Sequence, residues 1–91
     1  MLHCKKFELC PIDGRKSFYG KALVFIDSQN SIAYLYSYNT LVCFFDCETM
    51  KFRRTWGGYS VTTMRHVNAF RERYGFSKLS KREWMTLPLF M

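Results

Sequence analysis

Hydrophobic and polar residues alternate through the first half of the chain in the pattern of β-strands. Short apolar runs, separated by polar or glycine-containing turns, predict four to five strands within residues 5–9, 21–27, 31–38, 40–46 and 51–56. The run at 40–46, TLVCFFD, is the most apolar, so we expect it to be the central strand. The run at 51–56 carries charged residues on both faces, which is typical of an edge strand.

The period of the pattern changes after the glycine pair Gly57 and Gly58, which is expected to supply backbone angles that other residues avoid. From Val61, apolar residues recur at positions 64, 67, 70 and 74. This spacing predicts one long helix that begins after the N-cap Ser60 and ends at Gly75.

A second, shorter helix is predicted after Ser80. Ser80 and Glu83 have the spacing of a capping box, and Pro88 stops the helix. Strands followed by helices predict an α+β fold, an antiparallel meander of four to five strands followed by one long helix and one short C-terminal helix. Residues 1–91 are expected to form a single domain, because the chain is long enough for one modest core only.

The strand expected at 31–38 sorts its side chains by parity. One face carries Ile32, Tyr34, Tyr36 and Tyr38, and the other carries Ala33, Leu35 and Ser37. We expect the small face to meet a helix or tight packing. The tyrosine face is expected to be half-buried packing, and an exposed aromatic platform is the alternative.

Positive charge is concentrated in the second half of the chain. The net charge is +7, yet residues 22–50 contain no Lys or Arg, while residues 51–82 contain nine bases and one acid. Such a basic half favours an anionic partner, namely nucleic acid, a nucleotide or an acidic protein. The alternative is a solvated basic surface that only keeps the protein in solution.

The start of the long helix has the features of an anion site. Free backbone amides, the positive end of the helix dipole and nearby hydroxyl groups favour a phosphate there, and flanking aromatic rings would stack on bases. The candidate ligand-binding residues are Arg53, Arg54, Trp56, Tyr59, Ser60, Thr63, Arg65, His66 and Arg71. The alternative is that Ser60 and Thr63 only cap the helix and that Trp56 belongs to the core.

The sequence predicts neither an enzyme nor a metal protein. His66 is the only plausible base in a helix, and the Ser and Cys residues stand at no diagnostic distance from it along the chain. The cysteine spacings C-x5-C and C-x3-C match no common zinc pattern. We therefore expect no catalytic residues, no cofactor and no metal, and we expect free thiols.

The N-terminal residues MLHCKKFEL carry charges where a signal peptide would have an apolar region. No apolar run approaches the length that a membrane span needs. We therefore expect a cytoplasmic protein that does not insert into a membrane. The edge strand and the aromatic surplus leave a homodimer open.

Three segments, SFYGKA (17–22), LYSYNTLV (35–42) and YSVTTMRHVNAF (59–70), resemble an uncharacterised family of small proteins of phages and bacterial mobile elements. The resemblance covers most of residues 15–75 and implies no site residues. It implies a short accessory phage protein that acts in the host cytoplasm.

Together with the charge, the resemblance predicts a non-enzymatic phage-type accessory protein that binds an anionic ligand, with nucleic acid favoured over a nucleotide. The alternative is an anti-defence inhibitor such as an anti-CRISPR. Such an inhibitor would bind a host defence protein or nucleoprotein, or capture a signalling nucleotide.

Overall fold

The computed structural model describes residues 4–11, 18 and 20–90. Five strands form one antiparallel sheet in which each strand pairs with the next along the chain. The elements are β1 Cys4–Glu8, β2 Ala22–Asp27, β3 Ile32–Ser37, β4 Thr40–Asp46, β5 Lys51–Arg54, α1 Val61–Arg73 and α2 Lys81–Thr86. The predicted α+β meander, followed by a long and a short helix, is therefore confirmed.

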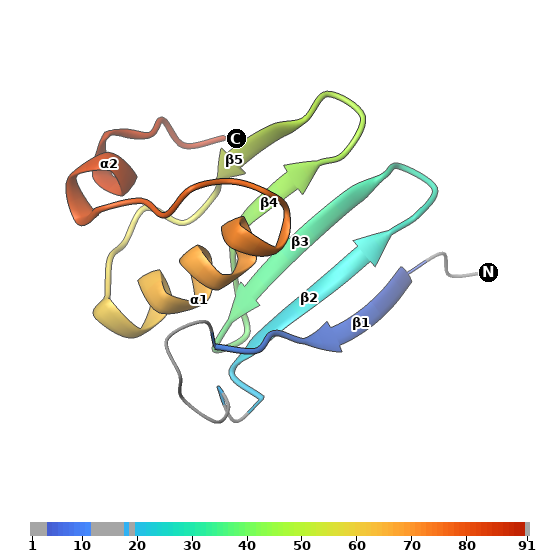
Figure 1. Cartoon of the computed structure of the whole chain (residues 1–91), viewed down its shortest axis with the longest axis horizontal. Helices are drawn as coiled ribbons and strands as arrows, with labels where there is room; N and C mark the ends of the chain where they lie inside the picture. Colours follow the sequence, from blue (N-terminus) through green and yellow to red (C-terminus); the bar gives the residue numbers. More distant parts are fainter. Residues whose placement is uncertain (1–3, 12–17, 19, 91) are drawn as a thin grey trace.

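Helix α1 lies across one face of the sheet, and α2 lies on the β5 side of α1 (Figure 1). The core fills the space between this face and the two helices. Val24 and Leu35 from the sheet meet Val67 and Phe70 from α1, and Trp84 is the buried anchor of α2. We call this the helix-bearing face, and the opposite side of the sheet the open face.

The small face of β3 packs as expected, since Ala33, Leu35 and Ser37 are buried on the helix-bearing face. The tyrosine face divides in two. Tyr34 and Tyr36 are half-buried, as predicted, while Tyr38 lies just after the strand and is 52% exposed. For Tyr38 the prediction of half-buried packing is wrong, because the chain turns there.

The prediction that residues 40–46 form the central strand is wrong, because β3 is central and β4 lies second from the edge. Cys43 and Phe45 of β4 are buried in the core, whereas Phe44 faces the open side. There Phe44 is shielded by Tyr34 and by Phe90, whose ring centroids lie 5.8 and 5.1 Å away. Phe44 is therefore covered on the open face by neighbouring aromatic rings and not by a second layer of helices.

The expected edge position of β5 is confirmed. The C-terminal segment runs beside its last residue, because Leu89 forms a parallel bridge with Arg54. The amide of Phe90 also donates to the Arg54 carbonyl at 2.7 Å. This contact brings Phe90 to the open face at the β5 edge.

Both helices begin as the sequence predicts. Ser60 caps α1, since its Oγ accepts a hydrogen bond from the Thr63 amide at 3.0 Å, and Gly75 follows the helix with a φ of +85°. The capping box of α2 is complete, because Ser80 and Glu83 each accept a hydrogen bond from the other's amide. These local signals act within a few residues, so the sequence alone reveals them.

Candidate functional site

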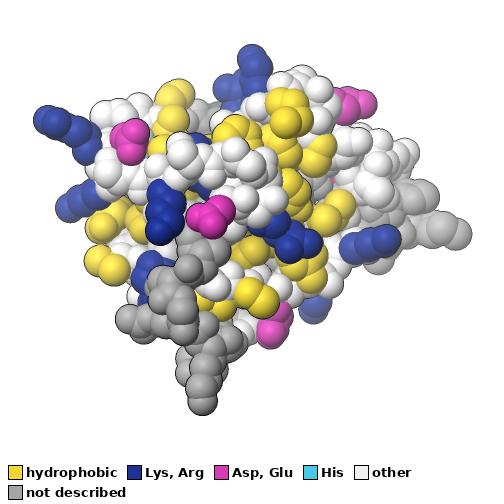
Figure 2. Space-filling model, viewed as in Figure 1, with side chains coloured by type: hydrophobic (Ala, Val, Ile, Leu, Met, Phe, Trp, Pro, Cys, Tyr) yellow, Lys and Arg dark blue, Asp and Glu magenta, His cyan; other side chains and the backbone are white. Residues whose placement is uncertain are grey.

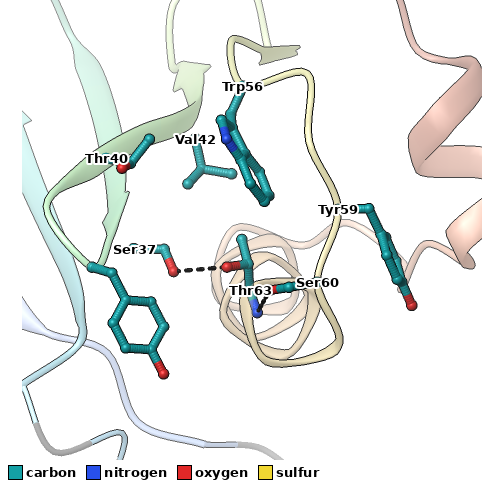
Figure 3. Close-up of a pocket in the computed structure, with 8 residues that line it drawn as sticks. Ser37, Thr40, Val42, Trp56, Tyr59, Ser60 and Thr63 are labelled. Atoms are coloured by element: carbon teal, nitrogen blue, oxygen red, sulfur yellow. Dashed lines mark hydrogen bonds between the residues drawn. The ribbon is translucent and has the colours of Figure 1, made fainter.

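A pocket of about 210 Å³ lies where the start of α1 meets the end of the sheet (Figure 3). Its walls come from the end of β3, the turn into β4, the loop after β5 and the first turn of α1. The lining residues are Ser37, Tyr38, Thr40, Val42, Trp56, Tyr59, Ser60 and Thr63. Four of the predicted site residues are thus brought together around one hollow.

Tyr38 reaches the pocket because the turn between β3 and β4 is tight. Tyr38 and Asn39 have φ angles of 50° and 67°, and they form the two-residue connection between the strands. Two positive φ angles are typical of the hairpin turn that matches the twist of the flanking strands. The turn places the exposed Tyr38 ring at the rim of the pocket.

Trp56 supplies the aromatic wall of the pocket and points from the loop after β5 toward the first turn of α1, while Tyr59 projects away on the other side of the loop (Figure 3). The Trp56 amide donates to the Val42 carbonyl at 3.0 Å, which holds this loop against β4. Trp56 is half-buried and also packs on the core. Trp56 therefore combines the two roles considered for it, since it lines the pocket and also belongs to the core packing.

The predicted reason for the glycine pair is wrong, since neither Gly57 nor Gly58 has a positive φ. Gly58 is required for space, because a Cβ atom there would lie 2.5 Å from Cζ2 of Trp56. The Gly58 carbonyl also accepts a hydrogen bond of 2.9 Å from the indole of Trp84. The glycine thus allows the close approach of Trp56 to a backbone segment that also binds Trp84.

A buried polar network forms the floor behind the pocket. The Ser37 hydroxyl lies 3.1 Å from Oγ1 of Thr63 and 2.8 Å from Nδ1 of His66. Ser37, Thr63 and His66 are 2%, 5% and 1% exposed. The network joins the end of β3 to the first two turns of α1 and fixes the helix against the sheet.

Burial and, to a smaller extent, the neighbouring Arg65 charge together lower the pKa of His66 to about 4. The imidazole is therefore neutral at pH 7. A Ser–His contact of this length also occurs in nucleophilic catalysis. Here both residues are buried and the histidine is a weak base, so the geometry favours a structural role.

Two of the predicted ligand-binding arginines are committed to the protein interior. Arg54 donates from Nε to the Trp56 carbonyl at 2.9 Å and from a terminal nitrogen to the Leu87 carbonyl at 2.9 Å, and it stacks on the Trp84 ring. It is 5% exposed and ties α2 to the sheet. Its assignment to the ligand site is therefore wrong.

Arg71 has the same kind of role. Its Nε donates to the Ser77 carbonyl at 2.8 Å, and its guanidinium lies 4.6 and 4.9 Å from the ring centroids of Phe52 and Phe76. Arg71 is buried, which lowers its pKa from the ordinary value. It holds the loop after α1 against the sheet, and His66, which is more deeply buried, is also unavailable to a ligand.

The other two predicted arginines lie away from the pocket. The Arg53 guanidinium lies 5.5 Å from the Phe90 ring centroid, and that of Arg65 lies 5.7 Å from the Phe18 ring centroid. A cation not predicted for the site, Lys81, lies on the outer side of the loop, where its Nζ is 4.8 Å from the Tyr59 ring centroid. The sequence interpretation missed Lys81 because α2 approaches Tyr59 only in the folded chain.

Ser37, Tyr38, Thr40 and Val42 also line the pocket and were not predicted to do so. The change from strand to helix periodicity in the sequence predicted only the wall formed by the loop after β5 and the start of α1. The tyrosine face of the strand expected at 31–38 was the available signal for the other wall, since its last member is the rim residue Tyr38.

Lys and Arg side chains are spread over the helix-bearing face and its edges, separated by hydrophobic and uncharged groups (Figure 2). The basic half of the sequence therefore forms no single patch on this view of the described chain. Within the described residues, no three His, Cys, Asp or Glu side chains gather in a way that would hold a metal ion. Cys10 and Cys47 are free and exposed, and burial raises the pKa of the free thiol of Cys43.

In the described part of the chain, neither helix has the length and apolar character needed to cross a bilayer. No curated protein sequence and no solved structure matches the chain. A family match covers residues 7–86 and carries no assigned function. It therefore leaves the phage or mobile-element context as a prediction, and it shows that the chain belongs to the Family of unknown function (DUF8033).

Proposed function

We propose that this protein is a non-enzymatic nucleic-acid-binding protein that holds a base in the pocket at the start of α1. The observation that carries the proposal is the combination of aromatic rings and hydroxyl groups around one hollow, in a chain of net charge +7. Aromatic rings stack on bases of any sequence, and polar groups beside them orient the base.

The size of the pocket supports a single base. About 210 Å³ is below the range typical of whole drug-sized ligands. Trp56 and Tyr38 offer rings at the wall and rim, and Ser60 and Thr40 offer hydroxyl groups. A base is flat, apolar on its faces and polar at its edges, so it matches this lining.

The electrostatics around the pocket favour a phosphate next to that base. The first turn of α1 contains no acidic residue, so nothing there opposes the positive end of the helix dipole. Lys81 adds a cation beside Tyr59. A nucleotide seated with its base toward Trp56 would have its phosphate next to the start of α1, and Lys81 would add positive charge on the outer side of the loop.

The phage-type accessory role and the host cytoplasm belong to this proposal through the three resembling segments. The anti-defence alternative, in which the protein binds a host defence protein or nucleoprotein, becomes the one to pursue where no nucleic acid or nucleotide binds. Capture of a signalling nucleotide would use the same pocket.

The test is equilibrium binding of labelled single-stranded DNA and RNA of about ten nucleotides, measured by fluorescence anisotropy. We expect binding at low salt and a steep fall of affinity as salt increases. Thr40→Trp fills the pocket from an exposed position and should weaken binding about tenfold, the effect of one lost stacking contact.

The matched control is Thr49→Trp, in the exposed turn between β4 and β5, which should leave the affinity unchanged. Equal affinity of the Thr40→Trp and wild-type proteins would remove the pocket as the site. Absence of binding to every oligonucleotide and to cyclic and linear nucleotides would reject the function itself. Capture of host proteins would then be the next experiment.

A further inference from the structure

The open face of the sheet carries an accessible aromatic surface. Among the described residues, neither helix lies on this face, because both pack on the other side (Figure 1). Its central side chains Phe25, Tyr34, Tyr36 and Phe44 are only half-buried. Aromatic rings left accessible at the centre of a sheet are a binding surface in several nucleic-acid-binding folds.

The strand register arranges this surface as a row. Lys6 is paired with Phe25, Phe25 with Tyr34, Tyr34 with Phe44, and Phe44 with Arg53. Residues directly opposite each other in neighbouring strands point to the same face. A row of three rings, which we call the aromatic row (Phe25, Tyr34 and Phe44), therefore crosses the sheet with a cation at each end.

The rings of the row are supported by further aromatic contacts. Phe25 meets Tyr36 with a centroid distance of 5.1 Å and an interplanar angle of 73°, and Phe44 meets Phe90 at 5.1 Å and 83°. Tyr34 and Phe44 lie 5.8 Å apart at 49°. Edge-to-face neighbours hold a ring in place while leaving one of its faces accessible.

The two cations lie beside the rings at the ends of the row. Nζ of Lys6 lies 6.0 Å from the Phe25 centroid, and the Arg53 guanidinium lies 5.5 Å from the Phe90 centroid. Unlike Arg54, Lys6 is exposed and Arg53 is half-exposed. Both charges can therefore meet a phosphate without leaving the surface.

The aromatic row is also continuous with the pocket at the start of α1. A second hollow, of about 320 Å³, is lined by Leu23 and Tyr36 of the open face together with Lys21 and Tyr38. Tyr38 lines both hollows. A chain molecule can pass from the first pocket over Tyr38 to the second hollow and onto the row.

We propose that the open face is a platform for single-stranded nucleic acid, on which bases stack on the aromatic row and phosphates contact Lys6 and Arg53. The proposal rests on the proposed function, since it takes nucleic acid as the ligand. It further specifies that the nucleic acid is single-stranded and that the open face is the main contact surface. A duplex keeps its bases stacked inside and offers none to a flat face of rings.

Charge distinguishes this occupant from a second copy of the chain. Two copies would bring together two molecules that each carry a net charge of +7. Asp27 and Asp46 lie two residues along their strands from the row, where Asp27 accepts from the Gln29 amide and Asp46 from the Glu48 amide, so their negative charges stay at the turn end of the face. The net charge of the chain and the two cations in line with the row therefore favour a polyanion over a second copy.

Ring substitutions test the stacking. Leucine at Phe25, Tyr34 or Phe44 keeps apolar bulk and removes the aromatic face, and each change should weaken single-strand binding roughly tenfold. The control is Phe52→Leu, which removes a ring from the helix-bearing face of the same sheet and should leave the affinity of the folded protein unchanged. Ultraviolet crosslinking of the wild-type protein, read by mass spectrometry, should attach nucleotides to the row whether or not a variant folds.

Charge substitutions test the phosphate contacts. Lys6→Gln with Arg53→Gln should lower the affinity and reduce the salt dependence of binding, because two phosphate contacts are lost. The control pair Lys78→Gln with Arg82→Gln removes the same charge from exposed positions near α2. An equal loss in both pairs would show that net charge alone matters and would overturn the platform.

Failure of the platform and failure of the proposed function give different results. Intact binding in all ring variants, with loss in Thr40→Trp, rejects the platform and leaves the pocket. No binding of any oligonucleotide by the wild-type protein rejects both. Equal affinity for duplex and single strands rejects the platform, and so does a wild-type dimer in sedimentation equilibrium that the ring variants convert to monomers without a change in binding.

Discussion

On the helix-bearing face of the sheet, Arg54 and Arg71 are buried and donate to backbone carbonyls, whereas on the open face Lys6 and Arg53 stay at the surface beside aromatic rings. Arg53 and Arg54 are neighbours in one strand and differ only in the face to which they point. Arg54 and Arg71 hold the protein together, whereas Lys6 and Arg53 stay accessible at the surface. A cluster of arginines in a sequence therefore does not by itself mark a ligand site.

The largest expected effect separates these neighbours. Arg54→Ala should reduce the free energy of unfolding by about 3 kcal/mol, because carbonyl groups that anchor α2 lose a charged donor. Arg53→Ala should reduce it by less than about 1 kcal/mol, since it loses only a contact with one ring. Urea denaturation measures both, and equal losses would contradict the division of roles between the two faces.

Low pH should reduce the stability of the fold through His66, which lies between α1 and the sheet. Its pKa is lowered to about 4 in the fold, against 6.5 for an ordinary histidine. The unfolded chain therefore takes up this proton first, so the stabilisation is complete above pH 6.5 and is lost as the pH falls toward 4. The difference between the two pKa values corresponds to a loss of about 3 kcal/mol in the free energy of unfolding.

Urea denaturation at several pH values measures this loss. The control is His66→Gln, which keeps a polar group near Ser37 and removes the titration in this range. A wild-type protein whose stability changes no more than that of His66→Gln between pH 6.5 and 4 would show that the imidazole is not buried in neutral form.

A smaller loss of stability is expected at the pocket wall formed by Trp56. Gly58→Ala should cost about 2 kcal/mol, because the new methyl group would overlap the Trp56 ring. Gly57→Ala is the matched control, since its methyl group would meet Leu89 at an ordinary 3.4 Å. Thermal unfolding measures the stability, and tryptophan fluorescence should report a displaced ring in the first variant only.

The smallest effect concerns the local cap of α2. Ser80→Ala should cost about 1 kcal/mol, because the Glu83 amide loses its acceptor. Ser77→Ala is the control, since alanine retains the backbone carbonyl that accepts from Arg71. A loss in Ser80→Ala as large as that in Arg54→Ala would mean that α2 depends on its cap more than on its contacts with the sheet.

Local signals in the sequence were sufficient for the order and type of the elements. Alternation predicted the strands, and Ser60 and Ser80 marked the helix starts, because these effects act over a few residues. The identity of the central strand was not predictable in the same way. The apolar residue on the second face of β4, Phe44, is covered by Tyr34 of the neighbouring strand and by Phe90 from the C-terminal segment.

For the candidate site, local sequence signals were enough to place an aromatic and hydroxyl-rich segment at the start of α1, with Trp56, Tyr59, Ser60 and Thr63. Tertiary structure decided which charges are available. Burial is a property of contacts between distant segments, so only the fold could commit Arg54 to α2. The same reason applies to the aromatic row, whose rings come from three strands and meet only through the register of the sheet.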